Sequence, residues 1–263
     1  MPAQLIDGKK IADKILAKIA KEIPKLKKRS GLAAVLIGAN PASKLYLKLK
    51  EKACQKAGID FHSYFIEKDC SEKQIIEVID FLNNDPDISG ILIQLPLPKK
   101  FNTDKIIRSI APAKDVDGFH PQTKVTSPNV LGIIELIKST GVNLKNQKIT
   151  ILSNSKKFAE PFKKLLPQSK ISHLKPQTSN LKTQTQKADI LIVAIGKPKF
   201  IKPSMIKKDA ILIDVGINKV KGKTIGDIDL ACDKVAAWRS PVPGGVGPMT
   251  VAMLLQNLIK MIK

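Results

Sequence analysis

Short, densely apolar runs alternate along the chain with segments in which apolar side chains recur at every third or fourth position. The short runs are typical of strands buried on both faces of a sheet, and the periodic segments are typical of amphipathic helices. Strands are expected at 33–38, 59–66, 88–95, 147–152, 170–174, 189–195 and 210–215, and helices at 71–83, 130–140, 158–166 and 181–187. This alternation predicts βαβ units and a mostly parallel sheet, so the fold class is α/β.

Small polar residues mark the expected starts of two further features. Ser71 is expected to cap the helix 71–83, and Ser43 is expected to be the N-cap of a helix that begins there. Before them, isoleucines at helical spacing between Gly8 and Pro24 predict a packing helix near the N-terminus.

The predicted elements form two successive series, separated by the turn-rich loop 111–128. The second series has the order of a compact Rossmann-like domain. After it, Gly247 at a cap and Pro248 at the first helical position predict a C-terminal helix whose apolar side suits packing against the first series. We therefore predict two domains: residues 1–121, completed by the helix 249–263, and residues 122–248.

Composition favours a globular protein that attracts anions. Hydrophobic residues make up 43% of the 263 residues and charged residues 26%, which argues against extensive disorder. The formal net charge is +22, almost all of it from lysine, which suits polyanionic small molecules. A nucleic-acid-binding protein is the alternative that charge alone suggests. Arginine, the usual base-reading residue, is scarce, and only 4% of residues are aromatic, so we expect no nucleic-acid partner.

The cysteines Cys54, Cys70 and Cys232 are widely separated and lack CxxC spacing. Neither a disulfide framework nor a metal site is predicted from them, and a reducing compartment fits best. No apolar run approaches the length of a membrane span, and the lysine-rich N-terminal segment lacks the apolar region of a signal peptide. We expect a cytoplasmic protein without a membrane partner.

Two polar side chains are candidates for proton chemistry, and a third is a candidate for ligand binding. Tyr46 and Lys50 are four residues apart on one predicted helix, so they share a face. An amine beside a phenol can move protons if burial favours the neutral lysine, although a solvated lysine and a core tyrosine are the commoner roles. Gln94 falls at the carboxyl end of a predicted strand, where ligands bind in open α/β sheets, so its amide could bind a heterocycle. On its own, however, the position favours a glutamine that faces water.

Two loops are further candidates. In the first, Asp115 and Asp117 stand two apart, and a carboxylate there could accept paired N–H donors from an aminopyrimidinone-like ring. An Asx turn helped by Gly118 is the alternative, and a metal site with His120 is less favoured than either. The second loop, 240–250, holds three glycines before a helix, and its free N–H groups would favour an anion or a carbonyl oxygen.

Six stretches occur in series: 41–50 (PASKLYLKLK), 90–98 (GILIQLPLP), 114–118 (KDVDG), 194–198 (AIGKP), 214–218 (DVGIN) and 241–250 (PVPGGVGPMT). In this order they resemble the signatures of the bifunctional methylenetetrahydrofolate dehydrogenase/methenyltetrahydrofolate cyclohydrolase family. The resemblance covers nearly the whole chain, and six motifs in register are specific where one would be weak. It implies an N-terminal folate-cleft domain, a Rossmann-like NAD(P)-binding domain and a C-terminal helix that packs back on the first domain.

The resemblance also implies two reactions and their residues. NADP-dependent oxidation of 5,10-methylenetetrahydrofolate is followed by hydrolysis of the methenyl product to 10-formyltetrahydrofolate; NAD is a possible cofactor. By family analogy Lys50 is the catalytic lysine, Tyr46 lies near the folate, Gln94 supports both and Asp117 anchors the pterin. The implied substrate residues also include Leu95, Pro243, Gly244 and Gly245, and the cofactor residues are Ser153, Asn154, Ser155, Lys175, Ala194, Ile195, Gly196, Val215, Gly216 and Ile217. A folate substrate that can carry a polyglutamate tail and a homodimer through the second domain complete the expectation.

The sequence departs from the family at two places on the cofactor side. The dinucleotide turn at 153–161 lacks the usual glycines, although Asn154 tolerates left-handed geometry and Lys175 can replace an arginine near the 2'-phosphate. The loop 122–131 is short. These departures keep a second hypothesis open, a cyclohydrolase that has lost dinucleotide binding, and a third is a non-catalytic folate-binding protein.

Overall fold

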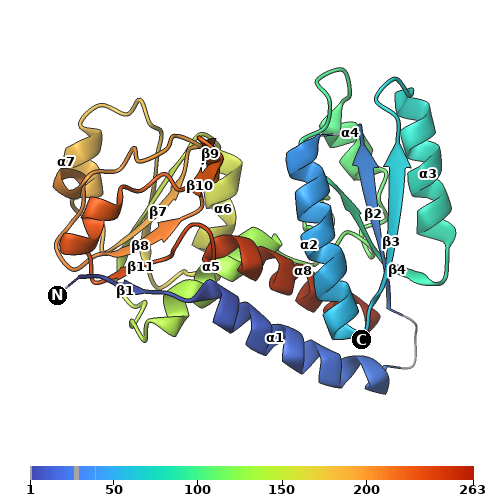
Figure 1. The fold of residues 1–263 in the computed structure, drawn as a ribbon, viewed down its shortest axis with the longest axis horizontal. Helices are drawn as coiled ribbons and strands as arrows, with labels where there is room; N and C mark the ends of the chain where they lie inside the picture. Colours follow the sequence, from blue (N-terminus) through green and yellow to red (C-terminus); the bar gives the residue numbers. More distant parts are fainter. Residues whose placement is uncertain (1, 27–29, 39) are drawn as a thin grey trace. The chain divides into compact units, whose positions relative to one another are not determined.

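The structure is a computed structural model that describes residues 2–26, 30–38 and 40–263 (Figure 1). The chain forms two compact units, and neither is continuous in sequence. The three-stranded unit comprises residues 12–128 and 251–263, and the six-stranded unit comprises residues 1–11 and 129–250. The divisions at residues 11 and 250 fall inside helices α1 (Gly8–Glu22) and α8 (Val246–Ile262).

The three-stranded unit is built on a parallel sheet with the order β3-β2-β4. Its strands are β2 (Gly31–Ile37), β3 (Asp60–Ile66) and β4 (Ile88–Ile93), and its helices α2 (Pro41–Ala57), α3 (Glu72–Asn84) and α4 (Thr103–Arg108). Figure 1 shows α2 and α3 on opposite sides of this sheet. Alternate residues of β2 supply the two cores: Leu32 and Leu36 pack with α2, and Ala33 and Val35 pack with α3. The central strand is therefore apolar throughout, as the sequence predicts.

The C-terminal helix completes the first of these cores. Leu254, Leu255 and Leu258 of α8 are buried in the same cluster as Leu32 and Leu36. The prediction that this helix packs against the first series of strands is confirmed.

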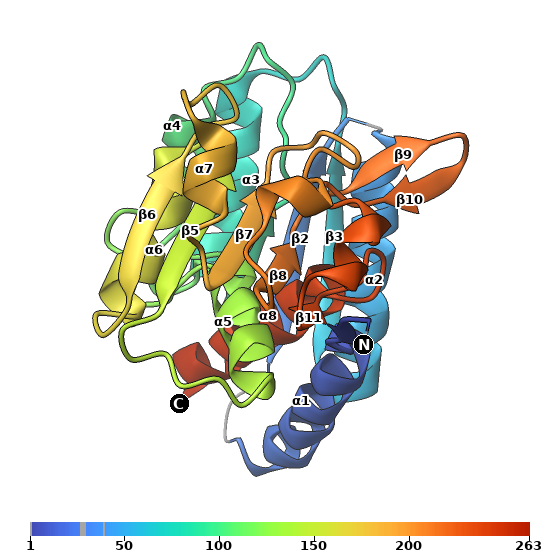
Figure 2. The same cartoon turned by 90° about the vertical axis from the view of Figure 1, so that its left-hand side faces the viewer.

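The six-stranded unit is a parallel sheet with the order β1-β11-β8-β7-β5-β6. The strands are β1 (Gln4–Leu5), β5 (Lys148–Ser153), β6 (Lys170–Leu174), β7 (Ile190–Ala194), β8 (Ile211–Asp214) and β11 (Trp238–Arg239). The helices are α5 (Pro128–Ser139), α6 (Lys156–Leu165) and α7 (Leu181–Thr185), and a hairpin pairs β9 (Asn218–Val220) with β10 (Lys223–Ile225). Figure 2 shows β6, β5, β7 and β8 side by side in that order. This is the Rossmann-like order that the sequence predicts.

Two predicted helix starts are wrong. The helix α2 begins at Pro41, and Asn40 Oδ1 accepts a hydrogen bond from Ser43 N at 3.3 Å, so Ser43 is not the N-cap. The helix α8 begins at Val246, which places Pro248 in its first turn and not at its first position. By contrast, Ser71 caps α3 in a capping box with Gln74, as predicted.

The predicted functional domains 1–121 and 122–248 stay a prediction, since the compact units divide the chain at residues 11, 128 and 250. Within the described ranges, no helix is long and apolar enough to cross a membrane.

Candidate active site

A buried lysine forms the centre of the polar site in the three-stranded unit. Lys50 lies on α2 and is only 8% exposed, and its Nζ donates a hydrogen bond to Gln94 Oε1 at 2.9 Å. Gln94 directly follows β4, and its Nε2 donates to Leu95 O at 2.9 Å. Because the amide nitrogen is engaged by that carbonyl, the amide oxygen is held towards the lysine. Gln94 is therefore a partner of Lys50 and does not face water.

Asp117 completes this polar group because its loop runs beside β4. Ile91 N donates to Lys114 O at 2.7 Å, and Ile91 forms a parallel bridge with Asp115. Asp115 itself is a turn former: its two carboxylate oxygens accept from Gly118 N at 3.1 Å and from His120 N at 2.7 Å. The Asx-turn interpretation is correct for Asp115, which argues against using its carboxylate for a metal and leaves Asp117 as the carboxylate whose charge acts on Lys50.

Burial and charge set the protonation of this site. Burial lowers the pKa of the Lys50 amine, and the nearby Asp117 carboxylate partly offsets that effect. Burial raises the pKa of Asp117 to about 6, although its side chain is partly exposed, and the charge on Lys50 opposes this rise. Burial also raises the pKa of the Tyr46 phenol, so it stays protonated. The site thus holds an amine that can accept a proton and a phenol that can donate a hydrogen bond.

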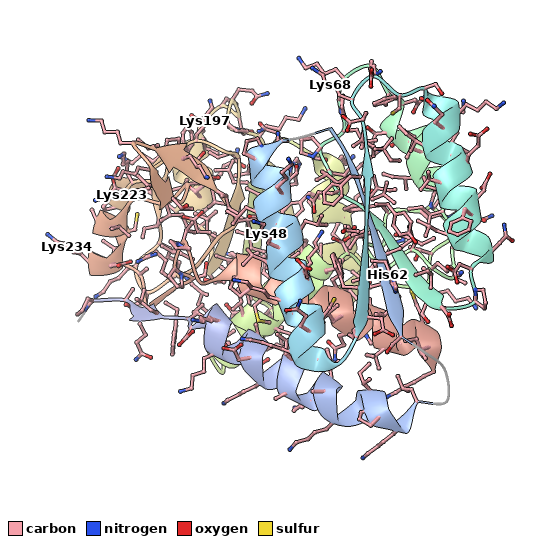
Figure 3. The ribbon with its side chains drawn as sticks, turned by 45° about the vertical axis from the view of Figure 1, so that its right-hand side comes forward. Lys48, His62, Lys68, Lys197, Lys223 and Lys234 are labelled. Carbon is pink, nitrogen blue, oxygen red and sulfur yellow. The ribbon has the colours of Figure 1, made fainter. Side chains whose placement is uncertain are left out.

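Lys50 differs in this respect from the lysines that dominate the composition. Lys48, Lys68, Lys197, Lys223 and Lys234, labelled in Figure 3, are all exposed. Only a lysine that has lost much of its hydration has its pKa lowered towards neutrality by burial. The neighbouring Lys48 is therefore a suitable reference for Lys50 on the same helix.

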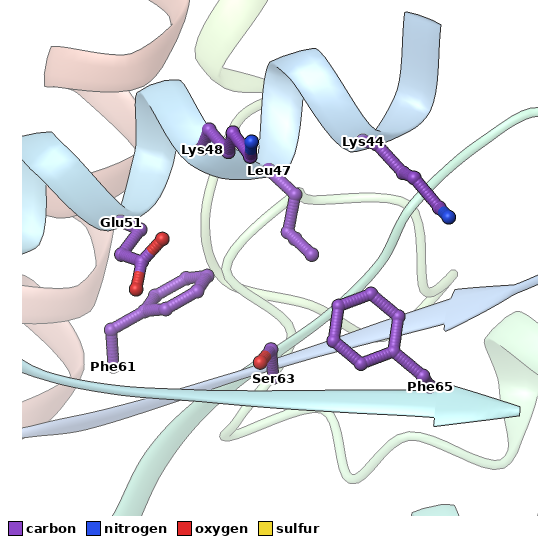
Figure 4. A pocket seen from close by; sticks show the side chains of 7 residues that line it. All are labelled: Lys44, Leu47, Lys48, Glu51, Phe61, Ser63 and Phe65. Atoms are coloured by element: carbon purple, nitrogen blue, oxygen red, sulfur yellow. The ribbon is translucent and has the colours of Figure 1, made fainter. Parts of the chain in front are cut away.

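A separate pocket of about 440 Å³ lies between α2 and β3 (Figure 4). Its lining comprises Lys44, Leu47, Lys48, Glu51, Phe61, Ser63 and Phe65. It uses other side chains of α2 than Tyr46 and Lys50, so it is distinct from the lysine site.

The predicted cofactor residues lie at the carboxyl ends of the strands in the six-stranded unit. The chain leaves β5 for β6 on one side and returns to β7 on the other, so the topological switch point lies between β5 and β7. Dinucleotides bind at such a point. Ser153 is the last residue of β5 and is followed by Asn154 and Ser155, and Lys175 follows β6. Ala194 is the last residue of β7 and is followed by Ile195 and Gly196, and Val215, Gly216 and Ile217 follow β8.

The glycine-free turn after β5 is held by side chains. Ser153 Oγ donates to Ser155 O at 2.9 Å, and Asn154 Nδ2 donates to Ile195 O at 3.2 Å across the switch point. Asn154 does not have a positive φ, so the left-handed geometry that asparagine tolerates is not used in this turn. Ser155 is the N-cap of α6 with extended backbone and no side-chain cap bond. The turn therefore forms without the conformational freedom of glycine.

Two buried carboxylates support the neighbouring loops. Asp227 Oδ2 accepts from Ile195 N at 2.8 Å and from Gly196 N at 3.0 Å, and its Oδ1 accepts from Lys197 N at 2.8 Å. Asp214, at the end of β8, accepts from Asp227 N at 2.9 Å. Burial is the main cause that raises the pKa of Asp214 to about 6, and the Asp227 charge adds to it.

The glycine-rich loop before α8 is packed against the start of α1 within the same unit. Gly244 has a φ of +107°, and its carbonyl accepts from Lys9 N at 3.0 Å. A Cβ on Gly245 would lie 2.6 Å from Pro241 O. These contacts explain why glycine is required at both positions, while the roles of Pro243, Gly244 and Gly245 in substrate binding stay a prediction.

Two family models match the chain in succession. The catalytic domain of tetrahydrofolate dehydrogenase/cyclohydrolase matches residues 6–117, and the NAD(P)-binding domain of the same enzymes matches residues 127–263. The bifunctional protein FolD of Nitratiruptor sp. is 43% identical over 278 residues, which cover 99% of this chain and 98% of that protein. The chain belongs to the tetrahydrofolate dehydrogenase/cyclohydrolase family.

Solved structures of the family have the same fold. The bifunctional FolD of Campylobacter jejuni is 36% identical with a TM-score of 0.94, and the match covers 99% of this chain and 98% of that chain. The Trypanosoma brucei dehydrogenase-cyclohydrolase, in complex with NADP and an inhibitor, is 27% identical with a TM-score of 0.94 and covers 100% of this chain and 98% of its own. The resemblance seen in the sequence is confirmed.

Several supporting residues of this family member were not singled out from its sequence. Asp214 was noted only within a motif, and Asp227 and Asn257 were not noted at all. Asn257 of α8 is fully buried, and its Nδ2 donates to Val116 O and Thr126 O, both at 2.9 Å. It thereby ties together both ends of the loop that carries Asp117. A polar residue on the otherwise apolar face of a predicted helix is the one signal that points to it.

Proposed function

We propose that Lys50 assists hydrolysis of the methenyl bridge in a bifunctional enzyme of one-carbon folate metabolism. The enzyme oxidises 5,10-methylenetetrahydrofolate to 5,10-methenyltetrahydrofolate and hydrolyses that product to 10-formyltetrahydrofolate. The observation that carries the proposal is the buried Lys50 amine, hydrogen-bonded to Gln94 and influenced by the charge of Asp117.

Each side chain has a role that its environment supports. In hydrolysis, a water oxygen adds to the cationic methenyl carbon and loses one proton. The bond from that carbon to N5 then breaks as the remaining hydroxyl proton is transferred to N5, which leaves the formyl group on N10. Lys50 accepts the proton because burial lowers its pKa, and Gln94 orients the amine. The Tyr46 phenol donates a hydrogen bond to the folate, and the Asp117 carboxylate accepts N–H donors of the pterin. Leu95 and the loop 243–245 complete the substrate contacts.

The cofactor edge fits a phosphorylated dinucleotide. A Cβ at Gly196, whose φ is +69°, would meet no heavy atom within 4 Å, so the backbone there borders open space. Lys156, Lys157 and Lys175 are exposed at the ends of β5 and β6 and supply positive charge for phosphates. NADP supplies the hydride acceptor when bound. The protein binds the phosphates at this edge, and Asn154 and Asp227 keep the turns after β5 and β7 fixed.

The finer parts of the proposal concern tail, assembly and compartment. The net charge of +22 supports a substrate with a polyglutamate tail. Free thiols at Cys54, Cys70 and Cys232 support a reducing cytoplasm. A homodimer through the NAD(P)-binding domain rests on analogy with the family.

One purified preparation measured in two assays tests the proposal. We expect hydrolysis of methenyltetrahydrofolate and NADP-dependent oxidation of methylenetetrahydrofolate, and we expect Lys50→Ala to lower the rate of hydrolysis by about 10²- to 10⁴-fold. Lys48→Ala is the matched control and should leave hydrolysis unchanged. Hydrolysis without oxidation would favour the cyclohydrolase that has lost dinucleotide binding, and normal hydrolysis by Lys50→Ala would remove the lysine from the mechanism.

A further inference from the structure

Asp227 binds three consecutive backbone N–H groups with one carboxylate. It has no exposed surface, and its oxygens accept from Ile195, Gly196 and Lys197 at 2.8 to 3.0 Å. A fourth donor, Asn218 Nδ2, lies 2.9 Å from Oδ1. An ionised carboxylate has about four acceptor positions, so this side chain is saturated by the protein itself.

These bonds fix the direction of the turn after β7. Since the N–H groups of 195–197 point to a fully buried carboxylate, they face the interior and are not available to a dinucleotide phosphate. The same turn borders the switch point, where Ile195 O accepts from Asn154 Nδ2. The conformation of one short turn is therefore set from inside by Asp227 and from the neighbouring turn by Asn154.

Asp227 is in turn held by the end of β8. Asp214 accepts from Asp227 N and from Ile228 N, both at 2.9 Å, and from Gly216 N at 3.0 Å. Glycines allow this close approach, because a Cβ on Gly216 would lie 2.2 Å from Asp227 Cγ and one on Gly226 would lie 2.0 Å from Asp214 Oδ2. The turns after β7 and β8 are thus parts of one hydrogen-bonded framework.

The framework needs a carboxylate and not an amide. Asparagine has one acceptor oxygen, so its NH₂ group would face at least one of the N–H donors that Asp227 satisfies. Keeping two carboxylates buried in contact with one network is costly, because like charges repel at low dielectric. The backbone donors offset this cost, and they belong to the turns that form the cofactor edge.

We propose that Asp227 is a positioning residue for the dehydrogenase reaction, which shapes the 195–197 turn that receives the nicotinamide dinucleotide without touching it. This inference rests on the proposed function. It also implies that the phosphates are bound by the segment 154–157 and its lysines, because the N–H groups of 195–197 are engaged elsewhere.

Asp227→Asn tests the proposal, with Asp229→Asn as the matched control. Asp229 accepts from Ala231 N and from Lys202 Nζ in a solvent-facing group two residues away. We expect Asp227→Asn to speed amide hydrogen exchange at 195–197, to raise the Kd for NADP measured by calorimetry about tenfold, and to leave kcat and KM for hydrolysis unchanged. The control should change none of these. Asn218→Ala removes one of the four donors and should shift the Kd in the same direction by less.

The outcomes separate the possible failures. Faster exchange at 195–197 with an unchanged Kd would show that the turn does not govern binding and would overturn the proposal. Hydrolysis that falls in step with NADP binding would show a general structural role and would also overturn it. If the wild-type protein binds no NADP, the dehydrogenase half of the proposed function has failed before any variant is measured, and the inference fails with it.

Discussion

The two units of this chain build their polar sites by different means. In the three-stranded unit the polar site consists of side chains: Lys50 lies on a helix, Gln94 at a strand end and Asp117 in a loop. In the six-stranded unit, the buried carboxylates Asp227 and Asp214 hold the backbone turns after β7 and β8. Motifs made of reactive side chains are visible in a sequence, whereas a site made of backbone shows only through the glycines and acids that support it.

The largest effect is expected from a substitution that adds a side-chain atom beside the carboxylates of the six-stranded unit. In Gly216→Ala the new Cβ would lie 2.2 Å from Asp227 Cγ, so the carboxylate or the turn must move. We expect a loss of about 3 kcal/mol in the free energy of unfolding of the six-stranded unit, from overpacking and lost hydrogen bonds. Denaturant unfolding measures this loss, and NADP binding measures the accompanying change at the cofactor edge.

Gly247→Ala is the control, because a Cβ there would meet no heavy atom within 4 Å and the residue lies within α8. It should be neutral or slightly stabilising. Equal losses in both variants would show that glycine is required for backbone conformation in general and not for the approach to Asp227.

The next effect concerns the support of the side-chain site. Asn257→Ala removes the donor of Val116 O and Thr126 O, both near Asp117 in the chain. We expect about 2 kcal/mol of destabilisation and a higher KM for the folate, since the buried Val116 carbonyl and the partly buried Thr126 carbonyl lose their donor. Urea unfolding and the KM of hydrolysis are the measurements. An unchanged KM would show that the hydrogen bonds of Asn257 do not affect the substrate site.

A pH titration should test the charge of Asp117 in the side-chain site. The pKa of Asp117 is raised to about 6, so its carboxylate is charged above that pH and becomes protonated below it. We expect the KM for the folate to rise by about tenfold per pH unit as pH falls below 6. Asp117→Asn should give a high KM that does not vary over this range.

An equally steep rise in Asp117→Asn would assign the titration to another group. The lowered pKa of Lys50 acts on a different quantity, because kcat of hydrolysis should increase as pH rises through that pKa and the amine becomes neutral.

The smallest expected effect comes from restoring a glycine to the turn after β5. Asn154→Gly removes the hydrogen bond to Ile195 O and adds chain entropy, and no positive φ at this position favours glycine. We expect about 1 kcal/mol of destabilisation and slightly weaker NADP binding. Calorimetric titration of the purified variant with NADP measures the change in binding. Tighter binding than in the wild type would show that Asn154 impairs the cofactor site.

Much of the fold could be predicted from apolar patterning. The strand 170–174 was located to the residue and most others to within two, because strands buried on both faces leave continuous apolar runs. The strands β1 and β11 have two residues each, too few to form a pattern. The start of α2 was predicted too late, because Asn40 and not Ser43 supplies the side-chain acceptor at the beginning of the helix.

The site was predicted unevenly for a related reason. Lys50, Gln94 and Asp117 stand out as polar residues in apolar or turn contexts, and the family motifs predict a role for each of them. Asp227 accepts from residues about thirty positions earlier, and such a contact depends on which strands are neighbours. The hydrogen-bond partners of Asp227 can therefore be predicted only once the order of the strands is known.

The interleaved units also bear on how the chain folds as it is made. Every part of the six-stranded unit precedes residue 251, whereas the core of the three-stranded unit needs Leu254, Leu255 and Leu258. A ribosome works from the N-terminus, and domains fold as units during synthesis. The strands β2, β3 and β4 are all made before β5, yet their unit is the last to be completed, because until α8 is made the core between β2 and α2 lacks these three leucines.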